Sequence, residues 1–193
     1  MKTLRKVPAL VIALSALAST SHAADIKVGA MGGFTGSLAE LSANVHKARE
    51  LALKQINAAG GLLKGDQLRF VTADSGCDAK TAVDAAGKLI NVERVVSVIG
   101  PTCSGETIAV AQNVTIPAGV MLITDSATSA GLTTLNDGDT VYRTAPANVD
   151  QAGALATIVK SHNITSIAMI VVNDDYNSCL LYTSDAADEG LGV

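Results

Sequence analysis

Short apolar stretches alternate with amphipathic stretches along most of the chain. The apolar stretches have strand length and are rich in β-branched residues, and they predict strands at 25–30, 68–74, 95–100, 120–124 and 166–172. The stretches between them carry apolar residues at helical spacing. They predict a helix of about 15 residues from near Ser42, with a stripe of Val45, Ala48, Ala52 and Ile56, and helices at 78–90, 105–114 and 150–162. This alternation predicts an α/β fold, a doubly wound parallel sheet with helices on both faces.

Ligands of doubly wound sheets bind beyond the carboxyl ends of the strands. Three loops of this chain occupy such positions: 31–37, 100–105 and 124–131. A flavodoxin-like strand order, 2-1-3-4, would place the first and third strands side by side and bring these loops together. That order is inferred in part from the family resemblance described below.

The first 23 residues have the pattern of a secretory signal peptide. A basic start, MKTLRK, precedes an apolar run that is short for a bilayer span, and Ser21 and Ala23 stand before a cleavage site after Ala23. A membrane anchor is the alternative, whereas a lipid anchor would need a cysteine directly after the run. We therefore expect export into a compartment where disulfides are permitted.

Composition narrows the function further. The chain is 48% hydrophobic and 17% charged, it has no Trp, and its net charge is −4. An aliphatic core is therefore feasible, and nucleic acid is not an expected partner because basic clusters and aromatic platforms are lacking. Three cysteines, Cys77, Cys103 and Cys179, leave one unpaired if two of them form a disulfide.

The stretch GPTCSGET at 100–107 resembles a phosphate-binding loop, but Glu106 stands where that loop has its lysine. An acidic residue there would repel phosphate, so nucleotide binding is disfavoured. Ser104 precedes a predicted helix, whose free N–H groups also suit a carboxylate. Ser126, Thr128 and Ser129 add hydroxyl groups after the fourth strand. These serines and threonines either hold a carboxylate or only cap helices.

No set of catalytic residues stands out. The chain has no G-x-S-x-G nucleophile turn, and His46 and His162 have no Ser or Cys close in sequence. The acidic pair at 174–175 lacks the spacing of a calcium loop. We therefore expect a protein that is not an enzyme and that uses no cofactor or metal.

Seven motifs in one order resemble the branched-chain amino acid group of periplasmic substrate-binding proteins, which serve ABC importers. The motifs lie within roughly residues 24–178 and are DIKVGAMGGFTG, INAAGG, DSGCDAKTAV, VIGPTCSGET, LITDSATSAGLT, YRTAPANVDQ and VNDDY. The resemblance implies the class I periplasmic-binding-protein fold, with two lobes that close on a ligand by a hinge. It divides the chain into a first lobe (24–145) and the start of a second (146–178).

The resemblance also implies roles for individual residues. Ser104 would hold the α-carboxylate of an amino acid. Ser126 would offer its backbone carbonyl to the α-ammonium, and Thr128, beyond Ala127, would contact both charged groups. Tyr176 would contribute from the second lobe, and Cys77 would pair with Cys103. Three positions depart from the family pattern: Leu41 where some relatives have an aromatic residue, Ser126 for a common alanine, and Asn177 for glycine.

The segment CLLYTSDAADE at 179–189 fits neither the family nor the preceding pattern. It reads as an in-frame translation of a transposase-type sequencing adapter, and a divergent helix or loop is the alternative. A non-native tail at 179–193 would explain the odd cysteine and would leave the second lobe truncated after residue 178.

Three function classes are distinguished by what each requires of the sequence. The first is the monomeric periplasmic receptor of an importer, which binds a branched-chain aliphatic amino acid and delivers it to a membrane permease; an amide, urea or aromatic ligand is a variant. The second is the ligand-sensing domain of a signalling receptor. The third, an exported hydrolase, lacks its catalytic residues.

Overall fold

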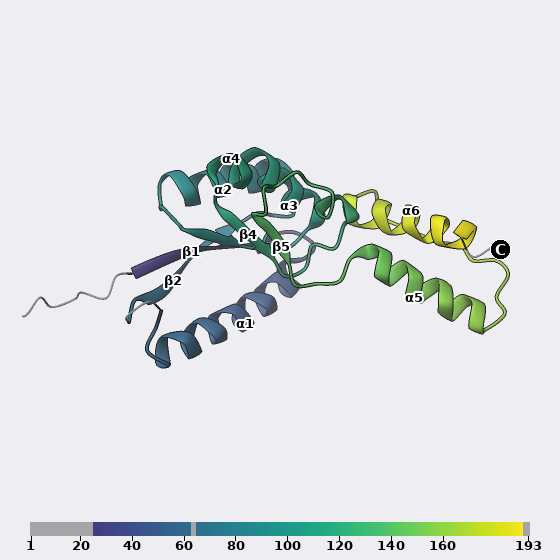
Figure 1. The fold of residues 1–193 in the computed structure, drawn as a ribbon, viewed down its shortest axis with the longest axis horizontal. Helices are drawn as coiled ribbons and strands as arrows, with labels where there is room; N and C mark the ends of the chain where they lie inside the picture. Colours follow the sequence, from purple (N-terminus) through teal and green to yellow (C-terminus); the bar gives the residue numbers. More distant parts are fainter. Residues whose placement is uncertain (1–24, 63–64, 191–193) are drawn as a thin grey trace, which may run out of the picture.

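The computed structural model describes residues 25–62 and 65–190, the last eight as backbone only (Figure 1). The predicted signal peptide lies outside the described residues. Among the described residues, no helix combines the length and the apolar character that a bilayer span requires.

A parallel sheet forms the centre of the described chain. Its strands are β1 (Asp25–Gly32), β2 (Gln67–Asp74), β3 (Ser97–Ile99), β4 (Met121–Thr124) and β5 (Val141–Arg143). They lie in the order β2-β1-β3-β4-β5, which confirms the predicted order of the first four strands. Ala30 of β1 lies beside Thr72 of β2 and Ile99 of β3, so the carboxyl ends of these strands share one edge.

Helices cover both faces of the sheet. Figure 1 shows α1 (Ala39–Ala58) on one side and α2 (Ala79–Asn91), α3 (Ser104–Val110) and α4 (Ile116–Ala118) on the other. Asp78 caps α2, because its carboxylate accepts from the Thr81 N–H at 2.8 Å. Away from the sheet, α5 (Asn148–Ser161) lies beside α6 (Asp175–Gly190).

The predicted helix at 105–114 is interrupted by a wider turn. A π-helical segment, Ala111–Thr115, separates α3 from α4, and a short 3-10 helix, Ala130–Leu132, follows β4. Pro117 explains the widening, because it has no N–H to bond the carbonyl four residues earlier.

The core lies between the sheet and the α2–α3 layer. Its buried members come from strands and helices alike: Met31, Ala82, Ala86, Leu89, Val95, Val98, Val110 and Leu122. Alanines on α2 let the helix approach closely, and Gly29 has the same effect on the strand side. A Cβ on Gly29 would lie 3.0 Å from the Leu89 side chain.

Three predictions of local structure are wrong. The segment 166–172 is not a strand: it does not pair with any strand of the described sheet, and Ile170 is fully exposed. Conversely, the sequence pattern does not predict β5. On α1, Ala48, Ala52 and Ile56 are exposed, and the face toward the sheet carries mainly polar residues, with Ser42 and Arg49 buried.

Candidate functional site

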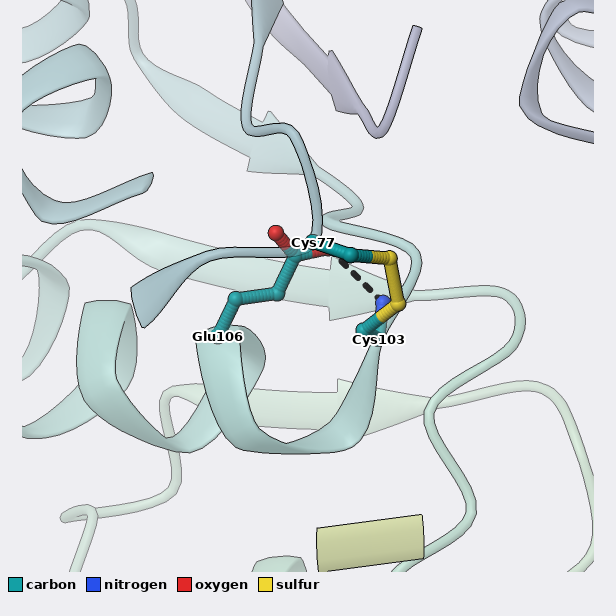
Figure 2. A group of neighbouring side chains, drawn as sticks. All are labelled: Cys77, Cys103 and Glu106. Carbon is teal, nitrogen blue, oxygen red and sulfur yellow. Dashed lines mark hydrogen bonds between the residues drawn. A yellow bond between two sulfur atoms is a disulfide. The ribbon is translucent and has the colours of Figure 1, made fainter. Parts of the chain in front are cut away.

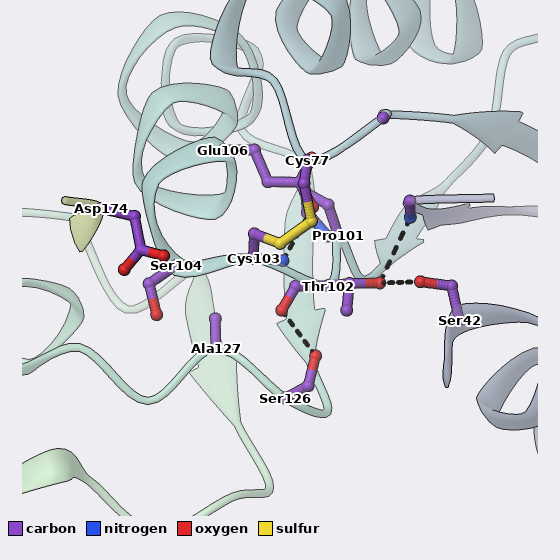
Figure 3. Close-up of a disulfide and its surroundings, with 12 residues drawn as sticks. Ser42, Cys77, Pro101, Thr102, Cys103, Ser104, Glu106, Ser126, Ala127 and Asp174 are labelled. Atoms are coloured by element: carbon purple, nitrogen blue, oxygen red, sulfur yellow. Dashed lines mark hydrogen bonds between the residues drawn. A yellow bond between two sulfur atoms is a disulfide. The ribbon is translucent and has the colours of Figure 1, made fainter. Parts of the chain in front are cut away.

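Thr102 joins the three loops at the carboxyl edge of the sheet (Figure 3). Its hydroxyl accepts from the Gly33 N–H at 3.4 Å and lies 3.1 Å from the Ser42 hydroxyl. Its carbonyl accepts from the Ser126 hydroxyl at 2.7 Å. The loops after β1, β3 and β4 therefore form one connected surface, as the strand order predicted.

Gly100 allows the loop after β3 to pass close to β1. Its φ of +91° lies in the left-handed region, and a Cβ there would collide with the Met31 carbonyl. The Gly100–Pro101 bond is cis. The Pro101 carbonyl then accepts from the Thr124 hydroxyl at 3.1 Å, which fixes the turn against the end of β4.

A disulfide joins Cys77 to Cys103 with a Cα–Cα distance of 5.5 Å, the pairing that the resemblance implied (Figure 2). It ties the loop after β2 to the start of α3. Glu106 lies close to both sulfur atoms. The three side chains do not make a metal site, because both thiols are consumed by the disulfide.

Glu106 caps α3 from inside the protein. Its Oε1 accepts from the Cys103 N–H at 2.7 Å, and the residue is 2% exposed. Burial raises the pKa of the Glu106 carboxyl, and the Cys103 N–H and the Ser75 hydroxyl oppose that shift only in part. Glu106 therefore has a structural role in this turn, because it is buried and accepts from the backbone at the start of α3.

Asp74 holds the loop after β1. Its carboxylate accepts from the N–H groups of Phe34 at 2.8 Å and Gly76 at 3.0 Å and from the N–H and hydroxyl of Thr35. Burial alone would raise the pKa of Asp74, but the hydrogen bonds from Thr35, Gly76 and Phe34 together hold it below its ordinary value.

Ser104 is the first residue of α3, and its hydroxyl does not cap that helix. Its Oγ instead accepts from the N–H groups of Thr128 at 3.2 Å and Ser129 at 3.3 Å, and the residue is 3% exposed. A serine hydroxyl has two acceptor positions and one donor. Both acceptor positions are filled, so Ser104 can only donate to a further group.

The loop after β4 places its hydroxyl groups differently. Thr128 Oγ1 is buried and has no hydrogen-bond partner among the described residues. Ser129 Oγ accepts from the Gly131 N–H at 3.2 Å and so caps the short 3-10 helix. Of the two roles considered for these hydroxyl groups, Ser129 therefore has the capping role. Ser126 donates to Thr102, and the buried Ala127 donates its N–H to Thr124 Oγ1 at 3.1 Å.

Tyr176 lies in the first turn of α6, and its hydroxyl is directed to α5. The hydroxyl donates to Gln151 at 3.4 Å, and the Tyr176 carbonyl accepts from the Asn148 amide at 2.9 Å. The same turn reaches the start of α3, because a Cβ on Gly105 would collide with the Asp175 carboxylate. Figure 3 draws Asp174, which directly precedes that turn, in the surroundings of the disulfide. An acidic group therefore lies directly against the start of α3.

Two arginines that sequence reasoning missed hold the loop after β4. Arg49 of α1 makes a two-point ion pair with Asp125. Arg143 of β5 donates to the Ser129 carbonyl at 2.9 Å and to the Thr133 hydroxyl at 2.6 Å. The one available signal was the spacing of Ser42 and Arg49, seven residues apart and hence on one helical face.

Comparison with known proteins identifies the family of this chain. Residues 44–188 match the model of a family described as the receptor family ligand binding region. The chain belongs to this family.

Within the family, the chain is similar to an amino acid binding protein of Pseudomonas aeruginosa, with 32% identity over 91% of this chain and 46% of the relative. A Leu/Ile/Val-binding protein of Citrobacter freundii is 35% identical over 88% of this chain and 45% of the relative. A branched-chain amino acid transporter substrate-binding protein of Streptococcus pneumoniae, solved with isoleucine, is 28% identical. It has a TM-score of 0.73 and aligns with 84% of this chain and 46% of that structure. The chain thus spans less than half the length of these relatives.

Proposed function

We propose that residues 24–178 come from the periplasmic substrate-binding component of an ABC importer and carry the first-lobe half of a site for a small branched-chain aliphatic amino acid. The Ser104 hydroxyl carries this proposal. It is buried at the carboxyl edge of the sheet, both of its acceptor positions are filled, and its one donor position is left for an anion such as a carboxylate.

The remaining groups are assigned to the α-carboxylate and the α-ammonium of the amino acid. Thr128 Oγ1, buried and unpartnered, is available to the α-carboxylate and the α-ammonium. We assign the backbone carbonyl of Ser126 to the ammonium, while its hydroxyl stays on Thr102. Ala127 lies between them, and Tyr176 belongs to the second lobe. A membrane permease would be the partner of the parent protein, which acts as a monomeric receptor and not as an enzyme.

We further propose that the parent binds its ligand well, whereas this chain binds poorly or not at all. The chain covers 46% and 45% of the length of its two curated relatives. By the proposed division into lobes, most of the second lobe lies in the part of the relatives that this chain does not cover. If residues 179–193 derive from an adapter, the parent has other residues where this chain continues α6 to Gly190. The Asp175 carboxylate beside Gly105 would also repel a ligand carboxylate.

Calorimetry with leucine, isoleucine and valine tests both parts. The parent, recovered from the uninterrupted gene, should bind at least one of them, and Ser104→Ala should weaken that binding. The matched control is Ser161→Ala, whose exposed hydroxyl only bonds Ile158 on α5. No binding by the parent would overturn the assignment, and micromolar binding by this chain would overturn the statement about the fragment.

A further inference from the structure

A partly buried ion pair connects α1 to the ends of two strands. Arg49 Nε and Nη2 donate to the two carboxylate oxygens of Asp125 at 2.7 and 2.8 Å. Its Nη1 donates to the Met31 carbonyl, at the end of β1, at 2.7 Å. The side chain of Arg49 is 8% exposed and that of Asp125 is 26% exposed. One guanidinium group therefore fixes the ends of β1 and β4 relative to each other.

Asp125 is the first residue of the loop that carries the candidate ligand groups. Residues 125–129 form neither helix nor strand, so side chains determine their path. The N–H groups of Ser126 and Ala127 point to Thr124 Oγ1, and those of Thr128 and Ser129 point to Ser104 Oγ. These four weak contacts, 3.1 to 3.4 Å long, require a loop whose start is already in place.

Stability alone does not account for such a pair. Removing two charges from water costs free energy that their attraction offsets only with good geometry, and apolar replacements of buried pairs are often neutral or stabilising. The two-point geometry instead fixes direction, because a planar guanidinium matches a carboxylate in one orientation. The pair is therefore better suited to setting the position of a loop than to holding the fold together.

We infer that Arg49 is a positioning residue for the loop 125–129, and through it for Ser126 and Thr128. That these residues meet a ligand rests on the proposed function; that Arg49 orders the loop does not. Arg143 supports the other end of the same loop through the carbonyl of Ser129. The loop is thus held at both ends by arginines from different elements.

Amide hydrogen exchange on the chain tests the ordering without any ligand. Arg49→Met should speed the exchange of the 127–129 amides at least about tenfold relative to the amides of β1 and β4, since their local opening becomes easier. Arg49→Lys should restore this protection only in part, because an ammonium group cannot reproduce the planar two-point contact. The matched control is Arg69→Met, which removes an exposed pair with Asp25 at 3.8 Å and should leave the loop amides unchanged.

A double variant separates positioning from stability. In Arg49→Met with Asp125→Asn, no unpaired charge remains, so the midpoint of urea unfolding should recover toward that of the original chain, while the 127–129 amides stay fast. Loop amides as slow as in the original chain, in Arg49→Met or in the double variant, would overturn the inference. If Arg49→Met alone does not fold, the exchange of the 127–129 amides is compared with that of the original chain in the double variant and in Asp125→Asn instead.

Calorimetry of the parent with leucine, isoleucine and valine keeps the two proposals apart. If the parent binds, Arg49→Lys should weaken binding in proportion to the loss of loop protection, and unchanged affinity despite a loosened loop would refute the link to the site. If the parent does not bind, the proposed function fails, and the exchange rates still decide whether Arg49 orders the loop.

Discussion

The disulfide between Cys77 and Cys103 should contribute a large share of the stability of this chain. The two residues are separated by 26 positions. In the chain-entropy model, closing a loop of that length removes freedom from the unfolded chain worth about 3.5 kcal/mol at 25 °C. The free energy of unfolding of a domain is typically about 5–15 kcal/mol, so replacing both cysteines by serine should remove a substantial fraction of it.

Urea unfolding, followed by circular dichroism, measures the effect. The variant Cys77→Ser with Cys103→Ser should unfold at lower urea and with a steeper denaturant dependence, because its unfolded state is less compact. Cys179→Ser is the control: the Cys179 sulfur accepts from the Ala130 N–H at 3.3 Å, and a serine oxygen can accept from the same group. That control should change the free energy of unfolding by less than about 1 kcal/mol.

A loss below about 1 kcal/mol in the double variant would refute the entropic reasoning. It would mean that the unfolded chain already keeps the loops after β2 and β3 together. An equal loss in the Cys179→Ser control would refute the assignment of the effect to the disulfide.

Three further outcomes are expected from single substitutions. The raised pKa of Glu106 gives stability that is present below pH 4.5, its unfolded value, and lost as the pH rises through the folded-state value. Glu106→Gln keeps the capping oxygen and should remove that loss, as urea titrations at several pH values would show. The lowered pKa of Asp74 gives stability that is lost as the pH falls from 3.8 through its folded-state value. Asp74→Asn should cost about 1–2 kcal/mol at pH 7 in the same assay. Gly105→Ala should push α6 away from the Asp175 contact and speed amide exchange in its first turn, whereas Gly87→Ala, on α2 with open space around it, should not.

The sequence pattern predicted the sheet well where a segment fits only one kind of secondary structure. Apolar β-branched runs between amphipathic stretches can be read as buried parallel strands, and all four predicted first-lobe strands exist in the predicted order. Asp78 was recognisable as a cap because an Asp before a helix is a local signal. The candidate site followed from topology, since parallel strands end at one edge.

What the sequence did not predict depends on interactions between residues far apart in the chain, which a local pattern does not show. The face of α1 toward the sheet is polar because Arg49 meets Asp125, 76 residues away, and this pairing overrides hydrophobic spacing. The Ser104 hydroxyl is engaged by a loop 24 residues further along the chain. Conversely, 166–172 has the composition of a strand, but a strand exists only where a neighbour pairs with it.

The unpaired segment 166–172 has a consequence for handling the protein. Its sequence, SIAMIVV, combines high β-propensity with no charge and no proline, and Ile167, Ile170 and Val172 are 44%, 102% and 68% exposed. Such a segment is a template for pairing with the same segment of another molecule. We expect this chain to aggregate as its concentration rises, and a lysine at the fully exposed position 170 to act as a gatekeeper that keeps it in solution.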